Sequence, residues 1–168
     1  REVVSHFLIS NFRYRSSGLL SEVLQGEVWR LISPMLLHYG ATHLIFNLLW
    51  LYQLGSQIEL AQGTLRFGLL VLVFAIGSNL TQYFFKGPYF GGMSGVNYGL
   101  IGYVWMRGRF DPASGLYLDT QNATLALVWF FVCFTPWLGV SVANYAHAGG
   151  LIMGLAWGIT SGLRARRR

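Results

Sequence analysis

The stretch GPYFGGMSGVNYGLIGYVWMRG, residues 87–108, carries most of the information about the fold. A glycine-rich loop, 87–92, precedes an apolar segment from Ser94 to Met106 that has the composition of a membrane helix. These 13 residues make roughly 20 Å of helix, whereas the hydrocarbon core of a bilayer is roughly 30 Å thick. If Arg107 marks one membrane surface, Ser94 lies about 10 Å below the other. Irregular backbone at that depth must be buried in protein or line a watery cavity, so we expect a water-accessible pocket at Ser94.

The composition of the whole chain favours a membrane protein. Of its 168 residues, 54% are hydrophobic and 11% are charged, and the mean hydropathy is +0.46. A soluble protein carries about 25% charged residues. The net charge is +6, and four of the twelve basic residues lie at 164–168. We interpret this tail as the cytoplasmic anchor of a final helix rather than a nucleic-acid site.

Five apolar segments predict an all-α membrane protein, a polytopic bundle of transmembrane helices. The short links between them are typical of antiparallel neighbours. Residues 1–40 contain no apolar run of the ~20 residues that a span needs, so we expect interfacial helices and loops there. The transmembrane core then covers 41–163, and 164–168 form a basic tail. The segments run from Thr42 (as N-cap) to Leu60, Thr64 to Phe85, Ser94 to Met106, Ala123 to Leu138 and Val142 to Gly162.

The positions of Lys and Arg predict the orientation of these spans. If the tail is cytoplasmic, the loop 107–121 and the turn 60–66, which carry three arginines, lie on the same side. The opposite short loops carry only Lys86. Residues 1–40 and the loop 87–92 are therefore expected to face outward.

The last segment offers Ser94 a partner from the same side of the membrane. His147 lies five residues in from Val142, roughly 8 Å along a helix, so imidazole and hydroxyl share a depth. Small residues at every fourth position allow two transmembrane backbones to approach closely. Gly95 lies on the serine helix, and the last segment carries Ala146, Gly150, Gly154, Gly158 and Gly162. We therefore expect a hydrogen bond between Ser94 and His147.

The first segment adds His43 and Asn47, four residues apart on one helix face. A serine activated by a histidine base is the minimum for nucleophilic acyl transfer. The tetrahedral intermediate needs hydrogen-bond donors, which the two side chains and the Ser94 backbone N–H could supply. The glycines at 91 and 92 would let a substrate backbone approach closely. The plainer alternative for Asn47 is a polar contact between helices.

Other chemistries fit the sequence less well. His38 and His43 are five apart, about 140° around a helix, and no acidic residue follows them as in the HExxH zinc motif. Asp111 and Asp119 both lie in a polar loop, which argues against an intramembrane aspartyl protease. A transporter usually places charged groups within its spans. Here only Glu59 qualifies, near a helix end.

Four motifs together resemble the rhomboid intramembrane serine proteases, and the bacterial GlpG-like branch most closely. They are GGMSG (91–95), AHAGGLIMG (146–154), HLIFN (43–47) and EVWRLIS (27–33). The resemblance covers residues 28–162. It implies cleavage of single-span membrane proteins near the outer face of the bacterial inner membrane, with no cofactor and no metal.

The resemblance also implies roles for individual residues. Ser94 matches the nucleophile, and His147 matches the general base of a dyad without an aspartate. The remaining matches are His43 and Asn47 as oxyanion stabilisers, Tyr98 as the tyrosine packed on the catalytic histidine, Gly92 and Gly95 as supporting residues, and Trp29 and Arg30 as a structural pair.

One departure from the family leaves alternatives open. The rhomboid core has six spans, whereas five are visible here, so we expect the first to precede residue 1. Rhomboid relatives without a dyad keep the fold and bind transmembrane helices, which makes a catalytically silent binder the second hypothesis. A small transporter is the third. The oligomeric state does not follow from the sequence.

Overall fold

A computed structural model describes residues 2–11, 19–136 and 141–167. Every regular element in these ranges is a helix, which confirms the all-α prediction. The α-helices are α1 (Glu2–Phe7), α2 (Ser21–Leu24), α3 (Ala41–Gln62), α4 (Thr64–Lys86), α5 (Ser94–Phe110), α6 (Thr120–Val132) and α7 (Asn144–Ala165). Short 3₁₀ turns are η2 (Val28–Leu31), η3 (Ser33–Leu36) and η4 (Pro112–Ser114).

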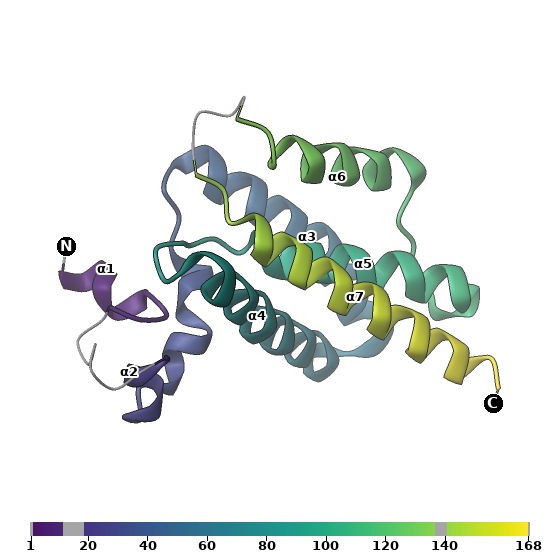
Figure 1. Cartoon of the computed structure of the whole chain (residues 1–168). Coiled ribbons are helices and arrows are strands. Elements are labelled where there is room, and N and C mark those ends of the chain that lie inside the picture. Colours follow the sequence, from purple (N-terminus) through teal and green to yellow (C-terminus); the bar gives the residue numbers. More distant parts are fainter. Residues whose placement is uncertain (1, 12–18, 137–140, 168) are drawn as a thin grey trace.

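Four long helices, α3, α4, α5 and α7, form the body of the molecule (Figure 1). Helix α5 contacts the other three, and its most extensive contact is with α7. Its middle is buried on all sides, with Leu100, Tyr103 and Val104 packed on Leu54 of α3 and Phe74 of α4 in one core. Helix α6 lies apart from this body and touches it mainly through α5. The serine helix is therefore the centre of the fold.

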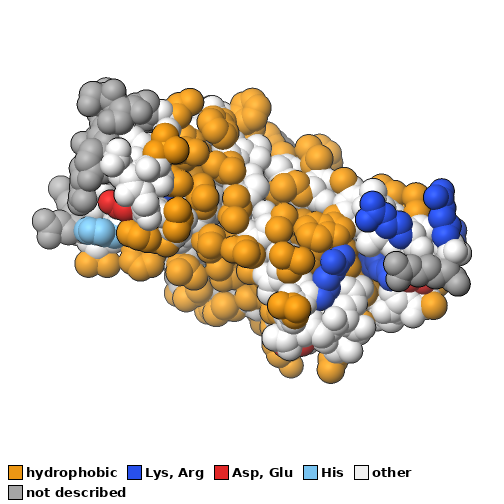
Figure 2. Space-filling view, turned by 90° about the horizontal axis from the view of Figure 1, so that it is seen from below, with side chains coloured by type: hydrophobic (Ala, Val, Ile, Leu, Met, Phe, Trp, Pro, Cys, Tyr) orange, Lys and Arg blue, Asp and Glu red, His pale blue; other side chains and the backbone are white. Residues whose placement is uncertain are grey.

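The predicted count of five spans is not confirmed. In the ranges described above, only α4 is both long and apolar enough to cross a membrane. The other long helices fall short for separate reasons. Helix α3 carries a polar stretch of Gln53, Ser56, Gln57 and Glu59, α5 has 17 residues, and α7 is rich in glycine. The surface nevertheless has an apolar middle, with Lys and Arg gathered at the end that carries the C-terminus (Figure 2).

The structure corrects several predicted helix ends. Helix α5 begins at Ser94 as predicted. It does not end at Met106, because Arg107 is also helical, and its last residue is Phe110. The Arg107 guanidinium pairs with Asp111 at 2.8 Å and donates to the Ser161 carbonyl at 2.7 Å. With 17 residues the helix is roughly 26 Å long, so it falls short of the ~30 Å hydrocarbon core by about 4 Å rather than 10 Å.

Smaller shifts affect the other helices. Helix α3 starts one residue before Thr42, so Gly40 and not Thr42 is its N-cap residue. Helix α6 starts at Thr120, three residues earlier than predicted, and ends at Val132. Its predicted end, Leu138, lies outside the described residues. Helix α7 runs from Asn144 to Ala165, shifted toward the C-terminus, so His147 lies in its first turn, roughly 5 Å in.

Helix α6 begins with a side-chain cap. Asp119 Oδ1 accepts a hydrogen bond from the Asn122 backbone N–H at 2.8 Å, and its Oδ2 accepts one from the Asn122 amide at 2.6 Å. The backbone hydrogen bond lowers the pKa of the Asp119 carboxyl from its ordinary 3.8, because it favours the ionised form. The cap is therefore strongest when Asp119 is charged.

We expect Asp119→Ala to lower the melting temperature of the detergent-solubilised protein modestly near neutral pH. A carboxyl group whose pKa is lower in the folded than in the unfolded protein stabilises the folded state at any pH above the unfolded pKa. This contribution is lost as the pH falls through the lower, folded-state pKa. The difference in melting temperature between wild type and variant should therefore become smaller at pH values well below 3.8, the ordinary pKa of this carboxyl group. Thermal unfolding of both proteins across pH measures it, and an unchanged gap in acid contradicts the cap.

Residues before α3 support the loop that leads to Ser94. Arg30 is fully buried: its Nη1 donates to the carbonyls of Ser5 and Leu8 at 2.7 Å, which ties α1 to η2, whereas Trp29 is 50% exposed. Asn79 of α4 donates to the Leu31 carbonyl at 2.9 Å. The Gly92 N–H donates to the carbonyl of Pro34 in η3 at 3.0 Å. These hydrogen bonds connect the residues before α3 to α4 and to the glycine loop 87–92.

Candidate active site

Ser94 and His147 meet at the same end of the bundle. Ser94 is the first residue of α5, and His147 lies in the first turn of α7. Ser94 Oγ lies 2.7 Å from His147 Nε2, within hydrogen-bonding distance. In the tautomer with the proton on Nδ1, the serine hydroxyl donates to Nε2, as activation of a nucleophile by a base requires. The imidazole is 3% exposed, whereas Ser94 is partly exposed.

Glycines bring the two helices together. A Cβ at Gly150 would lie 3.0 Å from the Gly95 carbonyl carbon and 3.2 Å from the Gly99 nitrogen. A Cβ at Gly154 would lie 2.8 Å from the Gly99 carbonyl carbon. Neither neighbour is a flexible side chain, so the backbones themselves are in contact. The predicted small-residue face is therefore the contact between α5 and α7, and it sets the separation of Ser94 and His147.

Packing and a helix cap hold His147 in place. The Tyr98 ring lies one turn after Ser94, with its centroid 4.7 Å from the imidazole centroid, and its hydroxyl donates to the Ala126 carbonyl of α6 at 3.0 Å. Within the described ranges, the buried His147 Nδ1 has no hydrogen-bond partner. Gln82 of α4 caps α7, because its Oε1 accepts from the N–H groups of Tyr145 and Ala146 at 3.0 and 3.1 Å. Gln82 was not predicted from the sequence, because its role depends on a contact between distant segments.

The glycines of the loop lie close against side chains of other segments. Gly92 has a φ of +121°, and a Cβ there would lie 2.7 Å from His43 Cε1 and 3.7 Å from Ser94 Oγ. A Cβ at Gly91 would lie 2.6 Å from the Leu37 Cβ. That these glycines also admit a substrate backbone stays a prediction. In the structure they make room for the chain's own Leu37 and His43, so the His43 ring can lie beside the serine hydroxyl.

Asn47 is buried next to this group and has a fixed orientation. Its Nδ2 donates to the His43 carbonyl at 2.9 Å, and its Oδ1 accepts from Asn97 Nδ2 at 2.9 Å. Asn97 Nδ2 also donates to the Asn47 carbonyl at 3.0 Å. Asn97 lies three residues after Ser94 and was not among the predicted site residues. A polar side chain within an apolar helix was the available signal.

If the site cleaves peptide bonds, as the resemblance to rhomboid proteases implies, Asn97→Val should lower kcat for cleavage by up to about tenfold, with little change in KM. A hydrogen bond contributes about 0.5–1.5 kcal/mol, and its loss frees the Asn47 amide to rotate. Steady-state kinetics on a fluorescent transmembrane substrate measure the effect. In an Asn47→Ala background the same substitution should change kcat little, because Asn97 acts through Asn47. An equal loss in both backgrounds contradicts this positioning role.

His38 also lies near the site, with its ring centroid 5.0 Å from that of His43. Its Nδ1 is 3.2 Å from the Leu36 carbonyl. In the part of the chain that the structure describes, no group of three His, Cys, Asp or Glu side chains could hold a metal ion.

Comparisons with known proteins agree with the geometry. The Rhomboid domain family matches residues 25–164. Proteins named Rhomboid protease GlpG from Salmonella paratyphi A and Salmonella newport are 43% identical over 146 residues, and one from Salmonella choleraesuis is 44% identical. The alignment covers 87% of this chain and 53% of each relative, so the chain spans about half the length of these curated relatives. By the family match, and by its identity to these proteins, the chain belongs to the rhomboid family.

Proposed function

We propose that this protein is an intramembrane serine endopeptidase that hydrolyses peptide bonds in or near transmembrane segments. The observation that carries the proposal is the 2.7 Å separation of Ser94 Oγ and His147 Nε2 at the ends of two tightly packed helices. The printed name of the relatives, Rhomboid protease, supports it. The alternative of a catalytically silent binder has no comparable support, because both members of the dyad are present.

In this proposal the reaction has two halves. Ser94 Oγ attacks the scissile carbonyl carbon while His147 Nε2 takes its proton, and the same proton then passes to the leaving amine. Water next attacks the acyl-serine, with His147 again accepting and returning a proton, which releases the acid and restores the serine. The oxyanion accepts hydrogen bonds from the Ser94 backbone N–H, the His43 imidazole and the second N–H of the Asn47 amide.

We propose that α3 to α7 lie in the bacterial inner membrane, with the dyad toward the periplasm and 164–168 in the cytoplasm. Helices α3, α4 and α7 have 22, 23 and 22 residues, roughly 33–35 Å each, which matches the hydrocarbon core. The apolar middle and the basic C-terminal end support this placement (Figure 2). In this placement residues 1–40 face outward and residues 41–163 form the transmembrane core. The proposed substrates are single-span membrane proteins.

Cleavage of a fluorescent single-span substrate by the purified protein, reconstituted in liposomes, tests the function. A protease releases two fragments whose masses locate the cut near one end of the span. A silent binder retains the intact substrate, and a transporter moves solutes without cutting it. Intact substrate recovered in complex with the protein contradicts the proposed activity.

A further inference from the structure

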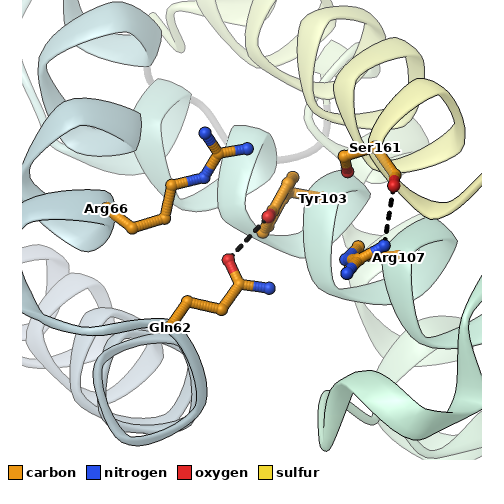
Figure 3. A pocket seen from close by; sticks show the side chains of 5 residues that line it. All are labelled: Gln62, Arg66, Tyr103, Arg107 and Ser161. Carbon is orange, nitrogen blue, oxygen red and sulfur yellow. Dashed lines mark hydrogen bonds between the residues drawn. The ribbon is translucent and has the colours of Figure 1, made fainter. Parts of the chain in front are cut away.

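A polar pocket of about 260 Å³ lies at the end of the bundle opposite Ser94. Its lining comes from all four long helices: Gln62 of α3, Arg66 of α4, Tyr103 and Arg107 of α5, and Ser161 of α7 (Figure 3). Arg107 is 13 residues beyond Ser94 on the same helix, or roughly 20 Å along its axis. The pocket is therefore separate from the candidate active site.

Hydrogen bonds within the lining leave mainly donors available to a ligand. The Tyr103 hydroxyl donates to Gln62 Oε1 at 2.7 Å, which directs the Gln62 amide nitrogen elsewhere. The Ser161 hydroxyl donates to the Gly158 carbonyl at 3.2 Å. Arg107 Nη1 donates a hydrogen bond to the Ser161 backbone carbonyl. The hydroxyl oxygens of Tyr103 and Ser161 can still accept a hydrogen bond. The free N–H groups of Gln62, Arg66 and Arg107 outnumber them, so the matching ligand is one rich in acceptors.

The pocket also carries a positive charge that the lining does not neutralise. Arg107 forms an ion pair with Asp111 at 2.8 Å. The Arg66 guanidinium instead lies over two rings, 4.9 Å from the Trp157 centroid and 5.8 Å from that of Tyr103. Among the described residues Arg66 has no ion-pair partner. Such stacking holds the guanidinium in place while its charge stays available.

We propose that this pocket binds the phosphate group of an anionic phospholipid. Guanidinium groups bind phosphate oxygens in pairs of hydrogen bonds, and basic pockets between transmembrane helices on the cytoplasmic side accept lipid headgroups. The pocket contains Arg66 and Arg107, and the end of the molecule that carries the C-terminus is where Lys and Arg gather beside the apolar middle of the surface (Figure 2). The inference rests on the proposed membrane placement but does not depend on the dyad.

Titration of the purified protein in neutral detergent tests this site. The probes are phosphatidylglycerol, phosphatidylcholine and inorganic phosphate, followed by native mass spectrometry and thermal shift. Gln62→Glu keeps an oxygen that can accept from Tyr103 but adds a negative charge to the pocket, so phosphatidylglycerol binding should weaken about tenfold or more. Arg66→Gln should weaken it similarly. Arg164→Gln, which removes the same charge from an exposed position at the same end, should leave affinity within about twofold.

The outcomes separate the sources of the phosphate group. Preference for phosphatidylglycerol over phosphatidylcholine, lost in Gln62→Glu and kept in Arg164→Gln, supports a lipid site. If inorganic phosphate produces the same variant-dependent shift at millimolar concentration, the pocket is an anion site filled from solution. Equal phosphatidylglycerol binding by wild type and Gln62→Glu overturns the proposal. Arg66 also packs on Trp157, so Arg66→Gln could weaken binding through a loss of stability. Its weaker binding is evidence for the site only if its melting temperature matches that of wild type.

Discussion

Ser94→Ala and His147→Ala are each expected to reduce cleavage of a transmembrane substrate by at least about 10⁴-fold. The first removes the attacking oxygen, and the second removes the group that lies 2.7 Å from it and accepts its proton. Because the two act as one unit, the double variant should be no slower than either single variant. Initial rates of fragment release from a fluorescent substrate, with enzyme in excess, measure losses of this size.

A matched serine and a folding test make this result specific. Ser56 also lies in a long helix, but its hydroxyl donates to the Tyr52 carbonyl of its own helix at 2.7 Å, so Ser56→Ala should retain full activity. The melting temperature of Ser94→Ala should stay near that of wild type. His147→Ala removes a buried ring that packs on Tyr98, so its melting temperature should fall, but it should still show a cooperative unfolding transition. Undiminished cleavage in either dyad variant contradicts the proposed mechanism.

Gly154→Ala is expected to lower the free energy of unfolding by about 1–3 kcal/mol and to reduce activity with it. The new methyl group would lie 2.8 Å from the Gly99 carbonyl carbon and 3.0 Å from the Gly99 Cα, and backbone atoms cannot turn aside as a flexible side chain can. Relief of this overlap moves α7 away from α5, and His147 moves with α7. Thermal unfolding and the cleavage assay, run on the same preparation, measure both effects.

Gly68→Ala is the matched control for this prediction. Gly68 also lies within a long helix, α4, but a Cβ there meets nothing within 4 Å. Alanine favours a helix over glycine by about 0.8–1.0 kcal/mol, so this change should leave stability unchanged or raise it slightly. If Gly154→Ala behaves like Gly68→Ala, the glycine contact does not set the position of α7.

The helix starts were easier to predict than the helix ends. Gly63 and Thr64 mark the start of α4, and the glycine loop marks the start of α5 at Ser94. The end of α5 was predicted wrongly because Arg107 was taken as a boundary. Its ion pair with Asp111 and its bond to α7 let the helix continue. A charge can end a membrane helix or extend it, and tertiary contacts decide which.

Residues of the site could be predicted only where a local sequence pattern specifies them. The glycine spacing on α7 indicated a close helix contact, and the motifs indicated Ser94 and His147. The contributions of Asn97 and Gln82 depend on partners 50 and 63–64 residues away, which no local pattern specifies. The space beside Gly92 likewise depends on where α3 places His43.

Covalent labelling of Ser94 tests the central claim most directly. We expect a fluorophosphonate probe to modify the detergent-solubilised wild-type protein at Ser94 alone, as located by peptide mass spectrometry. Labelling should fall to background in His147→Ala, because the imidazole that accepts the serine proton is gone. An unlabelled Ser94 in the folded wild-type protein, or equal labelling with and without His147, would contradict a histidine-activated nucleophile.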